Sequence, residues 1–371
     1  MNTAAPFTSK RLLSLDALRG FDMMWLIGAQ LIVAELAKWL KTPTLEAFAT
    51  QLQHVTWEGL QAEDLIFPLF MFLSGIAIPL SMESRIQRGD SKWQMWRKIL
   101  SRTVILILLG FIYNGVFSGN LEVPRYVSVL GQIGIAWGMA ASLYLVVRSP
   151  GKRLAILAGI LVLITVLHLL VPVPGHGAGI LTQTGAINTW LDRTFLPGRL
   201  SYTTFDPLGL LCIFSASALP IAGSLVGGTL RKPGAVSWKH TGLMFITGLA
   251  FFAAGWLCWH LGYPPIKSIW TTTFNLLGIG ISLILFAGFF GIIDVAGFQK
   301  WSFPLRVIGM NSLTGYLGVR LISLGGPVET FFGRIIRLCG DAGPSVRAAL
   351  TLLLMWLLLY FFYRKKWFLR V

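Results

Sequence analysis

Four ionisable side chains lie within a stretch of eleven residues, where a polar segment is followed by a long apolar one. They are those of His54, Glu58, Glu63 and Asp64. Histidine is the side chain best suited to proton transfer near neutral pH. A carboxylate within an apolar membrane segment costs roughly 3 kcal/mol, and it is tolerated only when it is paired or faces water. The stretch therefore predicts a functional site, with a hydrated loop and a capped helix start as the structural alternative. If the stretch is helical, His54, Glu58 and Gln61 share one face.

A second charged motif precedes the first apolar run. Ser14 is a suitable N-cap, and Asp16 would complement the helix dipole. Arg19, about one turn further on, opposes that dipole unless an anion lies nearby. Asp16 or the phosphate of a ligand can supply this anion. A purely structural Asp16–Arg19 pair is the alternative.

Further polar residues mark the ends of later apolar runs. Arg125 and Asp206 are candidates for a substrate-facing mouth, although Asp206 followed by proline is also an ordinary helix start. Lys267 and Trp270 are either site residues or interfacial anchors. Asn311, in the middle of an apolar run, requires an internal partner and can join two helices by hydrogen bonds.

The elements that position these residues are predicted to be membrane-spanning helices. Of the 371 residues, 55% are hydrophobic and 12% are charged, with a mean hydropathy of +0.70. Soluble domains average about 25% charged residues. Ten apolar runs approach the roughly 20 residues that a spanning helix needs. They cover residues 21–40, 60–82, 99–118, 127–147, 154–171, 207–230, 240–261, 269–293, 303–323 and 346–363. We expect an all-α, polytopic transmembrane bundle of about ten spans that forms a single domain over residues 1–371.

The net charge of +16 predicts the orientation of this bundle. About two thirds of the 31 basic residues fall on one side of the predicted spans. They lie in segments 10–19, 85–102, 148–153, 231–239, 300–306 and 364–370. The positive-inside rule makes that side cytoplasmic and places both termini there. No basic soluble domain suited to nucleic acid is present. The three cysteines lack metal-ligand spacing, and no metal site, phosphate-binding loop or dinucleotide fingerprint is expected.

Several motifs together resemble a known family, the heparan-α-glucosaminide N-acetyltransferases and their bacterial NagX-type relatives. The motifs are S-L-D-A-L-R-G at 14–20, H-V-T-W-E-G-L at 54–60, E-D-L-I-F-P at 63–68, D-P-L-G at 206–209, K-S-I-W at 267–270 and G-M-N-S at 309–312. The resemblance covers nearly the whole chain. It implies an acyltransferase that moves an acetyl group from cytosolic acetyl-CoA to an amino sugar on the other side of the membrane.

The resemblance also assigns roles to residues. The catalytic histidine of the family falls on His54, with Asp64 as the neighbouring acid. Ser14, Asp16 and Arg19 match the motif at the cytoplasmic end, where contacts with the phosphates of CoA are expected. We further expect a homodimer in a bacterial inner membrane, with the lipid bilayer and the amino sugar as its partners and without nucleic acid.

Two mechanisms remain open at this point. His54 either acts as a general base within a ternary complex, which we favour, or carries a transient acetyl group. Glu58 or Asp64 would orient its ring. Asn311, Gln30 or Lys267 would stabilise the oxyanion, and the sequence does not choose among them.

The chain departs from the family pattern at residues 319–320. The family has a His-Glu pair where this chain has Val319 and Arg320. This favours a free amino sugar or a cell-envelope glycan over heparan sulfate. An amino-sugar or glycan transporter, or a binding subunit without catalysis, remains the alternative function.

Overall fold

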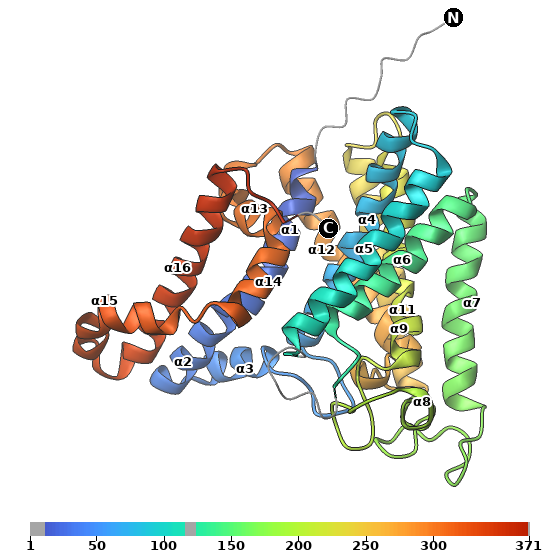
Figure 1. Ribbon diagram of the computed structural model, residues 1–371, viewed down its shortest axis with the longest axis horizontal. Helices are drawn as coiled ribbons and strands as arrows, with labels where there is room; N and C mark the ends of the chain where they lie inside the picture. The colour runs from blue at the N-terminus through green and yellow to red at the C-terminus, as the bar shows by residue number, and fades with distance from the viewer. Residues whose placement is uncertain (1–11, 116–123, 370–371) are drawn as a thin grey trace, which may run out of the picture.

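Helices are the regular elements of the protein in its computed structural model, which describes residues 12–115 and 124–369. The expected all-α fold is therefore confirmed. Figure 1 labels the helices in chain order. They are α1 (Leu13–Met24), α2 (Gln30–Leu40), α3 (Pro43–Gln51), α4 (Ala62–Gln87), α5 (Lys92–Tyr113), α6 (Val129–Val146), α7 (Pro150–Leu169), α8 (Ile187–Phe195), α9 (Leu210–Ala216), α10 (Ala218–Leu230), α11 (Trp238–His260), α12 (Thr272–Phe290), α13 (Phe303–Met310), α14 (Ser312–Leu321), α15 (Gly325–Leu338) and α16 (Gly343–Arg364).

Eight helical segments in the described part of the chain are long and apolar enough to cross a membrane. They are Leu13–Leu40, Ala62–Gln87, Val129–Val146, Pro150–Leu169, Leu210–Leu230, Trp238–His260, Thr272–Val295 and Gly340–Arg364. A polytopic membrane protein is thereby confirmed. The predicted span 99–118 corresponds to α5, whose first half carries Lys92, Arg97, Lys98 and Arg102, and residues 116–118 lie outside the described residues. The count of ten spans stays a prediction.

Two of the predicted spans are interrupted. The first bends at a π-helical segment (Trp25–Ala29), where Gly28 has a φ of 138°, a conformation open to glycine. The predicted span 303–323 is not one helix, because the backbone leaves the helical conformation at Asn311. The side-chain Nδ2 of Asn311 donates to the carbonyls of Val307 (3.2 Å) and Leu359 (3.4 Å), which joins this break to α16.

The helices pack around two hydrophobic cores. The larger core contains Phe72 and Ile76 of α4 together with side chains of α6, α7, α10 and α12. The smaller core joins α1, α13 and α16 through Met23, Ile308 and Leu359. In Figure 1, α13, α14 and α16 accordingly lie to one side of α4, α5, α6 and α7. Helix α1 contacts α4 and α12 as well as α13, so it connects the two groups.

Glycines let the helices approach one another closely. A Cβ atom at Gly309 would meet the backbone oxygen of Asp16, and one at Gly20 would meet that of Leu305, so α1 and α13 touch backbone to backbone. Gly223 of α10 faces the backbone oxygen of Phe72 in α4 in the same way. Small residues at helix contacts are the usual means of tight packing within membranes.

The bundle has two distinct ends. Helix α1 begins, α4 ends and α16 ends at one of them, at the top of Figure 1. We call it the basic end, because Arg85, Lys98 and Arg231 lie there. The loop that carries His54 lies at the opposite end, before α4 begins, and we call this the His54 end. Lys10, Arg11 and Arg370, which we counted among the basic residues of one side, lie outside the described residues.

We expect Gly223→Ala to destabilise the bundle, because its new methyl group would press against the backbone of α4. Overpacking of this kind typically costs about 1–3 kcal/mol. Gly159→Ala in α7 is the matched control, since no atom lies within 4 Å of a Cβ atom at that position. Thermal unfolding in detergent should show a lower midpoint for Gly223→Ala and an unchanged or higher one for Gly159→Ala. Equal midpoints would contradict the tight α4–α10 contact.

Candidate active site

The buried carboxylate of Asp64 is the centre of the candidate site. Asp64 lies in the first turn of α4 and has 1% of its surface exposed. Its Oδ2 accepts hydrogen bonds from the backbone N–H groups of Gln61 (3.2 Å) and Val55 (3.4 Å). A carboxylate at this position also interacts favourably with the helix dipole. Asp64 thus fixes both the start of α4 and the loop before it.

His54 contacts this carboxylate through one ring nitrogen. Its Nδ1 lies 2.9 Å from Oδ1 of Asp64. A neutral imidazole that donates from Nδ1 keeps a lone pair on Nε2. Within the described residues Nε2 has no hydrogen-bond partner, and 61% of the side chain is exposed. Asp64 therefore orients the ring with Nε2 free for a ligand.

Lys267 completes the cluster from a distant part of the chain. It begins a short 3₁₀ helix (Lys267–Ile269), and its Nζ lies 3.2 Å from both Oδ1 of Asp64 and Nδ1 of His54. With a proton on Nδ1, the ammonium donates to the carboxylate. Burial lowers the pKa of Lys267, and the neighbouring charge of Asp64 opposes this shift. The two loops are joined by a hydrogen bond from the N–H of Gly59 to the carbonyl of Pro265 (2.9 Å).

The segment between His54 and Gln61 is irregular, so the helical face that we considered for His54, Glu58 and Gln61 does not form. Gly59 has a φ of 120°, and the backbone turns here to reach Pro265. Glu58 is exposed, and no contact joins it to His54 within the described residues. Of the two acids considered for orienting the ring, Asp64 contacts it.

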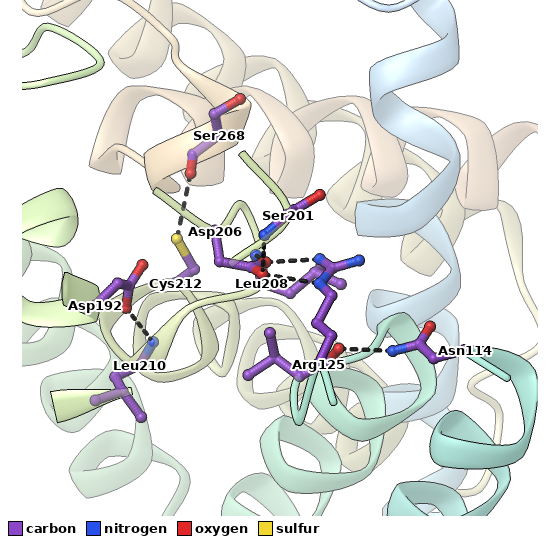
Figure 2. A network of polar contacts seen from close by, with 10 residues as sticks. Asn114, Arg125, Asp192, Ser201, Asp206, Leu208, Leu210, Cys212 and Ser268 are labelled. Atoms are coloured by element: carbon purple, nitrogen blue, oxygen red, sulfur yellow. Dashed lines mark hydrogen bonds and ion pairs between the residues drawn. The ribbon is translucent and has the colours of Figure 1, made fainter. Parts of the chain in front are cut away.

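Arg125 and Asp206 bind each other. The Nε and Nη2 atoms of Arg125 donate to the two carboxylate oxygens of Asp206 at 2.8 and 2.6 Å (Figure 2). Asp206 is fully buried, and it also accepts from the backbone N–H groups of Ser201 (2.9 Å) and Leu208 (3.0 Å). This bidentate pair closes the loops at the His54 end. Arg125 faces the cavity described below, but both carboxylate oxygens of Asp206 already accept hydrogen bonds from Arg125 and the backbone.

The start of α1 is capped by a residue that the sequence did not suggest. Asp294, just after α12, accepts hydrogen bonds from the backbone N–H groups of Leu13 and Ser14, both at 3.2 Å. The prediction that Ser14 is the N-cap is wrong, because the helix already begins at Leu13. Asp16 is buried 3.8 Å from Arg19, so the expected pair forms.

Of the remaining predicted residues, Asn311 and Gln30 contribute to packing rather than to the wall of the site, whereas Trp270 lines the cavity. The amide of Asn311 joins α13 to α16, as described above. The amide of Gln30 faces Glu63, with its nitrogen 3.0 and 3.1 Å from the two carboxylate oxygens in the orientation that satisfies both groups. Trp270 has 1% of its surface exposed and stacks edge-to-face on Phe67, so it supports the wall of the cavity.

A cavity of about 1470 Å³ connects the two ends of the bundle. His54, Asp64 and Lys267 line it at one end, and Arg85, Lys98 and Arg102 line it at the other. Between them it follows one face of α4 at helical spacing. The α4 residues along it are Glu63, Asp64, Ile66, Phe67, Phe70, Ser74, Ala77, Ser81, Met82 and Arg85. From Asp64 to Arg85 the helix advances by 21 residue steps, a rise of about 30 Å, which is the thickness of a hydrocarbon core.

The basic end of the cavity is lined by Arg19, for which the sequence predicts contacts with CoA phosphates, and by three basic residues that the sequence did not single out. Arg19, Arg85, Lys98 and Arg102 all line it. In the sequence, Arg85, Lys98 and Arg102 stand out only as members of the basic segment 85–102. The guanidinium of Arg102 lies over the ring of Trp137, 4.0 Å from its centre. Guanidinium and ammonium groups gathered at one mouth suit an anionic ligand such as a phosphate.

Asp192 is a further buried acid at the His54 end. Its Oδ1 accepts a hydrogen bond from the N–H of Leu210 (3.0 Å), which caps α9 (Figure 2). Burial raises the pKa of Asp192 to about 6, and the nearby charge of Asp206 adds to this rise. The folded state therefore binds a proton between pH 4 and 6 that the unfolded chain, with the ordinary pKa of an aspartate, has already released.

We predict that the wild-type protein loses stability relative to Asp192→Asn as the pH rises from about 4 to about 6. A shift of about two pKa units corresponds to roughly 3 kcal/mol at most. The asparagine keeps the hydrogen bond to Leu210 and does not titrate. Unfolding midpoints of both proteins between pH 4 and 8 provide the test. A difference that stays constant over this range would contradict the raised pKa.

Comparisons with known proteins agree with the resemblance seen in the motifs. A domain family of unknown function (DUF5009) matches residues 11–119. Heparan-alpha-glucosaminide N-acetyltransferase from Homo sapiens is 26% identical over 326 residues, which covers 72% of this chain and 48% of that protein. The same enzyme from Mus musculus is 26% identical over 379 residues, covering 86% and 56%. The chain thus spans about half the length of the curated relatives that it matches, and its similarity to this group of acetyltransferases is confirmed.

Proposed function

We propose that this protein transfers the acetyl group of acetyl-CoA to the amine of an amino sugar across a membrane. The observation that supports the proposal most strongly is the cavity itself. It joins a mouth lined by basic residues to a His54–Asp64 pair at the opposite end of the bundle. The similarity to N-acetyltransferases that act on a glucosaminide supports the same reaction.

His54 is the general base in this proposal. The amine nitrogen attacks the thioester carbonyl, the C–N bond forms, and Nε2 of His54 accepts the proton that the nitrogen loses. The C–S bond then breaks, and the departing sulfur takes this proton from the imidazolium, so the products are the acetamide and CoA thiol and His54 is neutral again. Asp64 holds the ring and stabilises the imidazolium that forms.

Lys267 is the best placed of the three residues considered for the oxyanion. It lines the cavity beside His54, whereas neither Gln30 nor Asn311 lines it. One of its three N–H donors is directed at Asp64, so the others can reach the thioester oxygen as negative charge develops there.

The two substrates approach from opposite ends. The phosphates of CoA would bind among Arg85, Lys98 and Arg102, with the acyl arm extended along α4 toward His54. The excess of basic residues makes that end cytoplasmic by the positive-inside rule. The amino sugar would then enter at the His54 end, from the extracytoplasmic side.

We expect His54→Ala to lower acetyl transfer at least about 100-fold, the usual contribution of a general base. The assay follows acetylated glucosamine and free CoA thiol with purified protein in proteoliposomes. His176→Ala, in an exposed loop after α7, is the matched control and should retain activity.

Three outcomes would contradict parts of this proposal. Full activity of His54→Ala would exclude its role as the base. An acetyl group trapped on His54 in the absence of acceptor would replace the general-base mechanism by a covalent one. Uptake of glucosamine into the vesicles without acetyl-CoA, unchanged in His54→Ala, would indicate a transporter.

The proposed donor site predicts a selective effect of Lys98→Ala. We expect the KM for acetyl-CoA to rise about tenfold, which corresponds to about 1.4 kcal/mol. The KM for a short acetyl thioester without phosphates, S-acetyl-N-acetylcysteamine, should not change. Lys92→Ala, on the same helix but away from the cavity, is the control. An equal rise for both thioesters would place the phosphates elsewhere.

A further inference from the structure

Glu63 is an acid of the candidate site to which the proposed mechanism assigns no role. It precedes Asp64 in the first turn of α4, lines the same cavity as His54 and Lys267, and has 6% of its surface exposed. It also lies within electrostatic range of both these residues. Its carboxylate therefore borders the space that an acceptor must enter to reach Nε2 of His54.

The two neighbouring carboxylates differ in their partners. Asp64 accepts from His54, Lys267 and two backbone N–H groups, so its oxygens are fully occupied. Among the residues that the structure describes, Glu63 faces one side-chain donor, the amide of Gln30. A neutral amide can hold a carboxylate in place, but it does not balance its charge.

A second buried acid, Asp22, lies close enough to Glu63 for the charge of Glu63 to act on it. Asp22 of α1 has 2% of its surface exposed, and its Oδ2 has no hydrogen-bond partner within the described residues. Glu63 is the acid whose charge acts on it most strongly. Arg19, the cation that acts on Asp22, lies 3.8 Å from Asp16. Acidic groups therefore outnumber basic ones around Glu63, and a buried carboxylate without a cation costs several kcal/mol within a membrane.

A cationic ligand beside Glu63 would remove this imbalance. The acceptor of the proposed reaction is such a ligand, because the amine of an amino sugar is an ammonium ion near neutral pH. An alcohol acceptor of the same shape carries no charge and would leave Glu63 uncompensated, so discrimination follows from charge as well as from shape.

We propose that Glu63, held in place by Gln30, binds the ammonium group of the acceptor and selects amines over alcohols. This inference rests on the proposed acetyl transfer and adds the residue that recognises the acceptor. The ammonium binds to Glu63 and releases one proton to water before the attack. The neutral nitrogen that results then attacks the thioester, and its second proton passes to Nε2 of His54. Glu63 takes part through its charge and forms no covalent bond.

The test is Glu63→Gln, which removes the charge but keeps the size of the side chain and a partner for Gln30. We expect the KM for glucosamine to rise at least tenfold, whereas the KM for acetyl-CoA stays unchanged. Glu46→Gln, an exposed acid on α3 at the same end of the bundle, is the matched control and should change neither value.

Direct binding separates this inference from the proposed reaction. We expect the wild-type protein, without acetyl-CoA, to bind glucosamine at least tenfold more tightly than glucose, and Glu63→Gln to lose this preference. A protein that lacks acetyl transfer but shows this pattern would overturn the reaction and support the binding site. Wild-type acetylation with unchanged glucosamine KM and binding in Glu63→Gln would overturn the role of Glu63 alone. Failure of the wild-type protein to bind glucosamine would also overturn it.

Discussion

The carboxylate of Asp64 is the interaction on which the rest of the site depends. It caps α4, orients His54 and pairs with Lys267, although these groups come from different parts of the chain. A buried carboxylate needs all of these partners, because removing one leaves a charge uncompensated at a cost of several kcal/mol. This side chain therefore joins the loop before α4 to the loop before α12, in addition to the backbone hydrogen bond from Gly59 to Pro265. The fold and the site share the same contact, so a change at Asp64 affects both.

Helix α4 has two faces with different tasks. One face packs against α10, where Gly223 lets the two backbones meet. Phe67, Phe70, Ser74, Ala77 and Ser81 belong to the other face, which lines the cavity. The cavity exists because α1, α13 and α14 form a second core with α16 and leave this face of α4 partly uncovered. The lining residues are mostly apolar or small, which would suit the acyl arm of the proposed donor, with its charged groups at one end of the bundle.

Hydropathy and local motifs predicted the helical membrane fold and the contact between His54 and Asp64, because both depend on residues close together in the chain. They did not predict contacts between distant segments. Lys267 reaches His54 across 213 residues, and Asp294 caps α1 across 280, at positions that no periodicity connects. Asn311 lies in an apolar run with the composition of a span, yet the helix breaks at this residue, where its side-chain amide donates hydrogen bonds to backbone carbonyls. Arg125 and Asp206 were each assigned to a substrate, whereas the folded chain pairs them with each other.

The distribution of charge gives the cavity a polarity. Arg85 and Lys98 supply positive charge at the basic end, and Glu63 supplies negative charge at the His54 end without a paired cation among the described residues. An anionic thioester and a cationic amine would then each be attracted to one mouth and repelled from the other. In the proposed reaction, only the uncharged acetyl group would have to pass the point where the substrates meet. A membrane protein that carried either whole substrate across would need to carry its charge through the hydrocarbon region, at a far higher cost. Transfer of the small neutral group avoids that cost, and this is the physical reason to favour a transferase over a transporter for this arrangement of charges.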